Sequence, residues 1–210
     1  MTYSYEEEER YYSRRWPTKP LPYLHLEQYL RCWINCEDVF NSKRVLDIGA
    51  GECVYSRVIA EKFAPKALVA CELFRERMLP AAIANTNANL SFVAGDCFKL
   101  PFKSGSFDVV YASLVLHQLP NLQDVLNEVK RVLSSGGTYI GWEPNPFNPV
   151  LLYRYFFRPH SRNQYLFWPY RAREIFESIG FKVSICYFYP KYPMIRSRFL
   201  GSCVGMIATR

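Results

Sequence analysis

The sequence has no apolar run that approaches the roughly 20 residues needed to cross a bilayer, so it predicts no membrane span. Four consecutive glutamates, residues 6–9, stand where a signal peptide would have basic and then apolar residues. The chain also lacks internal repeats and low-complexity stretches. Half of its 210 residues are apolar, which suits one well-packed domain rather than two. We therefore expect a single domain that is made and kept in the cytoplasm.

The paired cysteines of a zinc site are missing as well. The seven cysteines stand singly along the chain. Cys32 and Cys36 are one helical turn apart, but no second pair exists to complete four ligands. We expect free thiols, most of them buried, and no bound metal.

Acidic residues become scarce toward the end of the chain. The net charge is about −2 for residues 1–40, about +1 for residues 41–143 and about +8 for residues 144–210. The basic excess therefore lies in the last third. We expect the partner of this last third to be anionic, or to lie on an anionic surface.

Residues 45–53 join the pattern of a buried strand to a turn made of small residues. The first of them suit the parallel strand of a βαβ unit, and Gly49 and Gly51 let the chain turn sharply against a ligand. Glu72 ends the next apolar run, about 20 residues further on, where doubly wound folds place an acid that accepts hydrogen bonds from ribose hydroxyls. This spacing predicts a cofactor that contains a ribose.

The same turn argues against a dinucleotide. Val54 replaces the third glycine of the Gly-x-Gly-x-x-Gly fingerprint, and Glu52 would repel a pyrophosphate at the start of the following helix. A cofactor with a ribose but no phosphate fits better. S-adenosylmethionine is such a molecule, because its charged groups are a sulfonium, an amine and a carboxylate.

Short β-rich runs alternate with helical patterns along the chain, which is typical of a mostly parallel sheet covered by helices on both faces. We expect strands at residues 43–49, 67–72, 90–94, 107–113, 138–142, 181–189 and 203–208, and helices at residues 54–63, 76–84, 121–133 and 172–179. The helix at 121–133 has the clearest period of 3.6, with Asn121 offered as its N-cap. Gly136 and Gly137 are expected to end this helix before the fifth strand.

Five motifs follow one another in a fixed order: Asp-Ile-Gly-Ala-Gly at 47–51, Glu72, Gly-Asp-Cys at 95–97, Phe-Asp-Val-Val at 107–110 with Leu116 and His117, and a helix with a glycine pair at 126–137. Over residues 40–210 they resemble the class I S-adenosylmethionine-dependent methyltransferases, in the small-molecule branch called methyltransferase domain 11. The resemblance implies an α/β fold, Rossmann-like and doubly wound. Its mostly parallel seven-stranded sheet has an antiparallel last strand and helices on both faces.

The resemblance also implies that S-adenosylmethionine binds at the carboxyl ends of strands one to four and leaves as S-adenosylhomocysteine. Glu72 would accept from the ribose, Asp96 from the adenine amino group, and Asp47 would lie near the methionine amine. The full set of cofactor-binding residues implied in this way is Asp47, Gly49, Ala50, Gly51, Glu72, Leu73, Asp96, Cys97 and Ser113.

Methyl transfer is a direct displacement at the sulfonium carbon, so the protein mainly aligns the acceptor and excludes water. An oxygen acceptor usually also needs a base, whereas a neutral amine attacks without one. His117, His160 and Glu143 are the candidate catalytic residues. The alternative for each histidine is a hydrogen-bonded packing role, and for Glu143 it is an acid that caps its loop.

Residues 144–170 form an unusual insertion after the fifth strand. It carries nine aromatic residues between 147 and 170, interleaved with Arg154, Arg158 and Arg162. In the resembled family this segment commonly covers the acceptor, and we expect residues 1–40 to add a second, helical flap. The composition suits a ring-bearing or lipid-like acceptor with a carboxylate or phosphate. A lid that packs on its own sheet and a peripheral membrane contact are the alternatives.

Nucleic acid is the main rival partner, because basic and aromatic side chains together also bind single-stranded RNA. Tyr-Ala-Ser-Leu at 111–114 stands where base-amino methyltransferases carry Asn/Asp-Pro-Pro-Tyr/Phe, and no Pro-Cys pair is present there for carbon-5 methylation. We therefore expect methyl transfer to an oxygen or nitrogen of a small or lipid-like, anionic acceptor. An RNA methyltransferase and a non-catalytic scaffold that binds S-adenosylmethionine are the alternatives.

Overall fold

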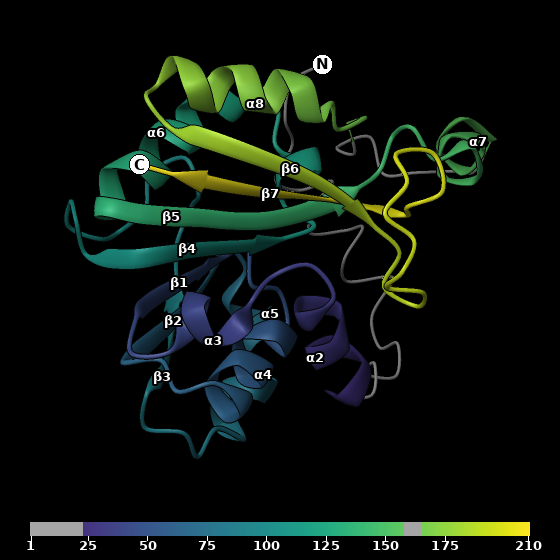
Figure 1. Ribbon diagram of the computed structural model, residues 1–210. Coiled ribbons are helices and arrows are strands. Elements are labelled where there is room, and N and C mark those ends of the chain that lie inside the picture. Colours follow the sequence, from purple (N-terminus) through teal and green to yellow (C-terminus); the bar gives the residue numbers. More distant parts are fainter. Residues whose placement is uncertain (1–22, 158–164) are drawn as a thin grey trace.

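The computed structural model describes residues 23–157 and 165–210 (Figure 1). The predicted flap residues 1–22, and His160, Arg158 and Arg162 of the predicted lid, lie outside the described residues. The helices are α2 (Tyr23–Arg31), α3 (Cys36–Phe40), α4 (Val54–Lys62), α5 (Arg75–Ile83), the 3-10 turn η1 (Leu116–Gln118), α6 (Leu122–Val132), α7 (Pro149–Phe157) and α8 (Pro169–Ser178). The strands are β1 (Arg44–Ile48), β2 (Ala67–Glu72), β3 (Leu90–Ala94), β4 (Phe107–Ser113), β5 (Leu133–Pro144), β6 (Lys182–Phe188) and β7 (Cys203–Thr209).

The seven strands form one sheet in the order β3-β2-β1-β4-β5-β7-β6. The first five strands pair in parallel, and β7 lies antiparallel between β5 and β6. This arrangement confirms the predicted Rossmann-like sheet with its antiparallel last strand. Because the strand order reverses between β1 and β4, the loops after these two strands diverge and leave a place for a ligand at the carboxyl edge.

Hydrophobic cores cover both faces of the sheet, as predicted for a doubly wound fold. One core joins Val45 of β1 to buried residues of α2, α3, α4 and α5. The other joins the alternate β1 residues Leu46 and Ile48 to α6 and α8. Successive residues of a strand point to opposite faces, so β1 is buried on both sides, as its apolar residues Val45, Leu46 and Ile48 predict.

The carboxyl ends of the parallel strands lie at one edge of the molecule. In register, Ile48 pairs with Cys71 of β2 and Ala112 of β4, and Ser113 pairs with Trp142 of β5. Figure 1 shows this edge on the right, where α2, α7 and the segment between β6 and β7 also lie. Among the described residues, no helix is long and apolar enough to cross a bilayer.

The prediction for the fifth strand was wrong at its start. β5 begins at Leu133, directly after α6, and not at residue 138. Its pairing with β4 shifts from Phe107 opposite Leu133 to Val109 opposite Thr138, so residues 134–137 of β5 face the single residue Asp108, and three extra residues bulge out of the strand. Gly136, with a φ of +73°, lies inside this bulge and does not separate helix from strand.

Asn121 occupies the N-cap position of α6, yet its side chain caps no helix N–H; its amide donates to the Asp124 carboxylate instead. All seven cysteines are free and five of them are buried, as expected. Cys32 and Cys36 do not share a helix, because α2 ends at Arg31 and α3 begins at Cys36.

Candidate functional site

The loop after β1 has a shape that favours glycine at two positions. Gly49 and Gly51 have φ angles of +61° and +57°, in the left-handed region. A Cβ on Gly49 would lie 2.7 Å from Cγ2 of Val115, which follows β4. The N–H of Ala50 donates to the Cys71 carbonyl at 3.0 Å and ties the loop to the end of β2. The loop is therefore fixed between β2 and the turn after β4.

Glu72 holds the next position along this edge. Its side chain is 5% exposed, and its Oε2 accepts the Gly51 N–H at 2.8 Å. Its Oε1 accepts the Phe74 N–H at 3.3 Å and lies 3.3 Å from Nη1 of Arg77. The predicted ribose-binding acid is thus anchored directly beside the glycine loop.

Arg77 was not predicted from the sequence. Its guanidinium lies over the loop, since a Cβ on Gly51 would come within 2.8 Å of its Nη2. The charge of Arg77 also opposes the rise that burial causes in the pKa of Glu52. One signal in the sequence pointed to Arg77. It lies in the first turn of the helix that follows Glu72, and that helix begins at the carboxyl edge of the sheet.

Asp47 is buried inside this region, with 2% exposure, and accepts the Ser56 hydroxyl of α4 at 2.5 Å. Burial raises the pKa of Asp47 from its ordinary 3.8 to about 7, and the nearby charge of Glu72 adds to this rise. The side chain therefore links β1 to α4 at the base of the loop. Its contact with a methionine amine stays a prediction.

The loop after β3 carries the predicted adenine-binding residues. The Gly95 N–H donates to the Glu72 carbonyl at 3.0 Å, and Oδ1 of Asp96 accepts the Phe98 N–H at 2.9 Å. A Cβ on Gly95 would lie 2.8 Å from the Cys71 sulfur, so the loop packs tightly on β2. Three further predicted residues at the edge are partly exposed: Leu73, Cys97 and Ser113.

Glu143 and His117 form a closely bonded pair after β4 and β5. The Glu143 side chain is 2% exposed; its Oε1 accepts the Val115 and Leu116 N–H groups at 3.1 and 2.7 Å. Its Oε2 lies 2.6 Å from Nδ1 of His117 and 3.4 Å from that residue's N–H. The carboxylate therefore holds the η1 turn and orients the imidazole, so that Nδ1 carries a proton toward Glu143 and Nε2 is the nitrogen suited to accept one.

Aromatic side chains from the predicted lid gather near the ends of β5 and β6. The Phe147 ring centre lies 6.0, 5.9 and 6.2 Å from those of Trp168, Tyr170 and Tyr187. The Arg198 guanidinium carbon lies 3.8 Å from the centre of the Phe147 ring. Arg198 was not predicted, because it is far from the insertion in the sequence and only the sheet topology brings it there.

Residues 46–141, from β1 to β5, match the family model of a methyltransferase domain. This match places residues 46–141 in the class I S-adenosylmethionine-dependent methyltransferases.

Relatives and solved structures agree with this family. The demethylmenaquinone methyltransferase of Geobacillus kaustophilus is 31% identical over 128 residues, which cover 58% of this chain and 55% of the relative. The sterol 4-C-methyltransferase of Caenorhabditis elegans is 47% identical over 51 residues, covering 24% and 15%. A chloroplastic uncharacterized methyltransferase of Arabidopsis thaliana is 31% identical over 130 residues, covering 53% and 37%. The chain thus spans about half, or less, of the length of these curated relatives.

Two solved structures share the fold at 17% identity. An S-adenosylmethionine-dependent methyltransferase from Mesorhizobium loti superposes with a TM-score of 0.67, covering 82% of this chain and 93% of that one. A chain of the complex between the Haloferax volcanii Trm112 methyltransferase activator and a methyltransferase superposes with a TM-score of 0.73, covering 89% of each.

The carboxyl edge of the sheet carries hydrogen-bonding groups that fit S-adenosylmethionine. The loop carries no Cβ at Gly49 or Gly51, and Val115 and Arg77 occupy the space that a side chain there would need. Glu72 and Asp96, at successive strand ends, are acceptors that match ribose hydroxyls and an adenine amino group. Among residues 23–157 and 165–210, no group of three or more His, Cys, Asp or Glu side chains could hold a metal ion.

Asp108 lies away from the carboxyl edge, at the start of β4. Its carboxylate accepts the Arg44 guanidinium at 2.7 Å and the Ser134 hydroxyl at 3.1 Å. The Arg44 guanidinium holds the pKa of the Asp108 carboxyl well below its usual range. This acid therefore joins β1, β4 and β5 at the opposite end of the sheet.

Proposed function

We propose that the protein transfers the methyl group of S-adenosylmethionine to an oxygen or nitrogen of a small or lipid-like, anionic acceptor, with His117 as the base. One observation carries the proposal. Val115 packs against Gly49 of the cofactor loop, and its own N–H is bonded to the carboxylate that orients His117. The imidazole and the cofactor loop are thereby fixed relative to each other.

Bound S-adenosylmethionine supplies an electrophilic methyl group on its sulfonium and leaves as S-adenosylhomocysteine. Glu72 and Asp96 would hold its ribose and adenine through accepted hydrogen bonds, and the loop at 49–51 would lie against it with bare backbone. Nε2 of His117 would take the proton from an acceptor hydroxyl as the oxygen attacks the methyl carbon. Glu143 would stabilise the resulting imidazolium, which makes it a positioning residue.

The acceptor chemistry is supported by the aromatic cluster around Phe147. Flat apolar rings with a guanidinium on one of them suit a ring-bearing or lipid-like molecule with a carboxylate or phosphate. Two relatives are named for ring-bearing, lipid-like substrates, demethylmenaquinone and a sterol, and the anionic group of the acceptor rests on the basic side chains alone. The sterol relative's name specifies carbon, so a carbon acceptor is the second candidate, and the same base would serve it by removing a proton from that carbon.

We also propose that the protein works in the cytoplasm, because seven free thiols suit a reducing compartment. One relative is described as chloroplastic, so cell fractionation has to test this placement.

The function is tested by transfer of a labelled methyl group to a panel of phenols, quinols, fatty acids, sterols, amines and RNA. We expect turnover with one of the small acceptors, and for a hydroxyl acceptor a fall in kcat of about 10²–10⁴-fold in His117→Ala with unchanged cofactor affinity. Gln118→Ala, the neighbour in η1, is the matched control and should keep its kcat. Methylation of RNA alone, or no turnover with any acceptor, would contradict the proposal.

A further inference from the structure

The helix α7 is apolar but buries none of its side chains. Seven of its nine residues, Pro-Val-Leu-Leu-Tyr-Arg-Tyr-Phe-Phe, are Val, Leu, Tyr or Phe, and none of the nine counts as buried. Phe156 and Phe157 are 66% and 72% exposed, and Val150 and Tyr153 are similarly exposed. A helix of this composition normally packs into a core, so its exposure indicates a surface that contacts something else.

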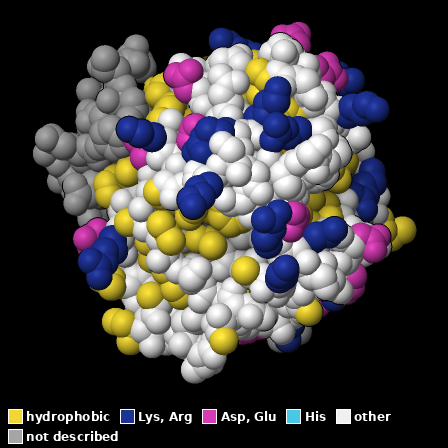
Figure 2. Space-filling view, turned by 90° about the vertical axis from the view of Figure 1, so that its left-hand side faces the viewer, with side chains coloured by type: hydrophobic (Ala, Val, Ile, Leu, Met, Phe, Trp, Pro, Cys, Tyr) yellow, Lys and Arg dark blue, Asp and Glu magenta, His cyan; other side chains and the backbone are white. Residues whose placement is uncertain are grey.

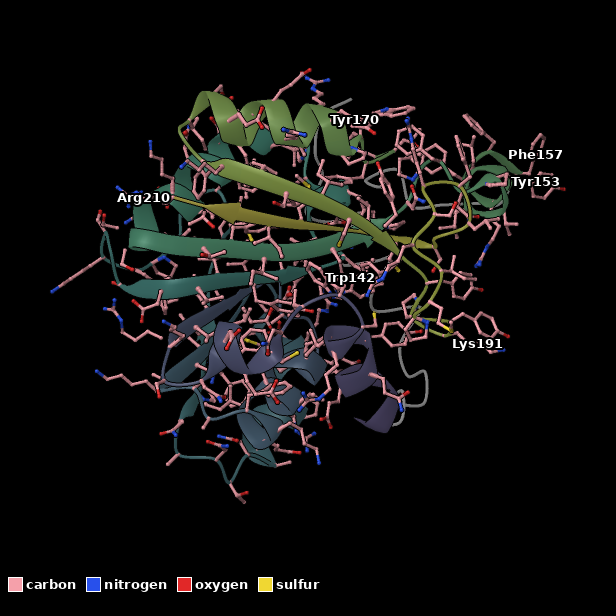
Figure 3. All side chains as sticks on the ribbon, viewed as in Figure 1. Trp142, Tyr153, Phe157, Tyr170, Lys191 and Arg210 are labelled. Carbon is pink, nitrogen blue, oxygen red and sulfur yellow. The ribbon has the colours of Figure 1, made fainter. Side chains whose placement is uncertain are left out.

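A second exposed apolar segment lies between β6 and β7. Within residues 191–200 the exposed side chains include Tyr192, Phe199 and Leu200, and Met194 is 96% exposed. We call α7 together with residues 191–200 the α7 surface. Figure 3 shows Tyr153 and Phe157 of α7 and Lys191 of the second segment at the same end of the molecule, and Arg210 at the opposite end.

Buried asparagines hold the two segments together. The side-chain amide of Asn145 donates to the carbonyls of Arg198 and Gly201 at 2.7 Å, and that of Asn148 donates to Leu200 and Gly201 at 3.2 Å. Asn148 also caps α7, since its Oδ1 accepts the Val150 and Leu151 N–H groups. The hydrogen bonds of Asn145 and Asn148 therefore fix the positions of the two segments that carry the exposed apolar residues.

The charge of this surface has one sign. Arg154, Lys191, Arg196 and Arg198 lie in it, and neither α7 nor residues 191–200 contain an acidic residue. After Glu143 the chain has only two acidic residues, Glu174 and Glu177, and both are in α8. On the opposite side, where the parallel strands begin, acidic side chains are interspersed with basic ones (Figure 2).

Aromatic and aliphatic side chains bordered by Lys and Arg fit the headgroup layer of an anionic bilayer, where rings reach the acyl boundary and the bases meet phosphates. A second copy of this chain would bring the same positive charge against itself, which opposes self-association through this surface. We propose that the α7 surface docks the protein onto anionic phospholipid membranes. This docking goes beyond the proposed function, and it would also bring a lipid-like acceptor close, since β5 carries Glu143 and leads into α7.

Flotation with vesicles tests the docking without any turnover. We expect the protein to float with vesicles of phosphatidylglycerol and phosphatidylcholine, to bind pure phosphatidylcholine at least about tenfold more weakly, and to be released by salt. Phe156→Ser with Phe157→Ser should lower the partition coefficient by at least about tenfold, because two membrane-inserted rings are lost. Ile83→Ser is the matched control, since Ile83 is 83% exposed at the end of α5 and should have no effect.

Charge is tested in the same way. Arg154→Gln with Lys191→Gln should weaken binding to the anionic vesicles several-fold, and Lys62→Gln with Lys103→Gln, exposed bases outside the α7 surface, should not. Failure of the native protein to float, equal loss in the two control variants, or a dimer that the Phe156→Ser and Phe157→Ser changes dissociate would overturn the proposal. Methyl transfer to a water-soluble acceptor is measured separately, so a failure of docking and a failure of the proposed function give different results.

Discussion

At the scale of single residues, the buried carboxyl group of Asp47 makes the stability of the fold depend on pH. Its pKa is raised from 3.8 to about 7, chiefly by burial. A carboxyl group whose pKa is higher in the folded chain binds its proton more tightly when folded. It therefore stabilises the fold fully below about pH 4, and this contribution is lost as the pH rises to about 7.

Asp47→Asn should remove that pH dependence. Between pH 5 and pH 7 we expect the native protein's free energy of unfolding to lose up to about 2 kcal/mol more than that of the variant. Urea unfolding at both pH values measures this difference. Asp38→Asn, a change at an exposed acid of α3, is the control and should leave the slope unaltered. Equal slopes for the native protein and Asp47→Asn would contradict the account.

Residue by residue, the sequence placed Glu72 and the two loop glycines correctly at the sheet edge, because strand patterns and turn chemistry are local. It could not show that both carboxylate oxygens of Glu143 are hydrogen-bonded to the turn at 115–117, since those partners are 26 to 28 residues away in the sequence. Arg77 and Arg198 were missed because the direction of a long basic side chain depends on the tertiary packing around it, which the sequence does not show.

At the scale of elements, the loop between β1 and α4 carries the tightest constraint in the site. Gly49→Ala would bring its Cβ to 2.7 Å from Val115 in a left-handed conformation, so we expect a loss of about 2–4 kcal/mol in unfolding free energy. Gly105→Ala has a similar φ of +71° but no atom within 4 Å, so it should cost only about 1 kcal/mol. Thermal or urea unfolding of the two variants measures this difference in unfolding free energy.

The double variant Gly49→Ala with Val115→Ala separates the clash from the backbone strain. It should recover part of the loss, because the shorter side chain makes room for the new methyl group. If Gly49→Ala were no more costly than Gly105→Ala, the contact between the cofactor loop and the turn after β4 would be wrong. The link between that loop and His117 would then lose its basis.

Helices and strands with a clear local sequence pattern were predicted well, and those without one were not. β2, β3 and β4 have the predicted bounds, because each is a short β-rich run between turn residues. α7 was missed because its apolar residues surround the helix and leave no stripe. A signal was nevertheless present, since Asn148 before Pro149 is an N-cap followed by proline at the first helical position. The β5 bulge depends on pairing with Phe107, which the sequence does not reveal.

At the scale of the whole molecule, one edge of the sheet gathers the features that the proposed function needs. The glycine loop, Glu72 and Asp96 follow β1, β2 and β3, and the His117–Glu143 pair follows β4 and β5. The α7 surface continues from the end of β5 at the same end of the molecule (Figure 1). The topology predicts this gathering, because parallel strands end together where their order reverses.

The most direct test of this account is calorimetric titration of the protein with S-adenosylmethionine, S-adenosylhomocysteine and NAD. We predict binding of the first two at about micromolar dissociation constants and none of NAD. Glu72→Ala should weaken both by about 1–3 kcal/mol, because the ribose loses a buried acceptor, while Glu76→Ala on the exposed side of α5 should not. Binding of NAD, or no binding of either sulfur compound, would contradict the central claim.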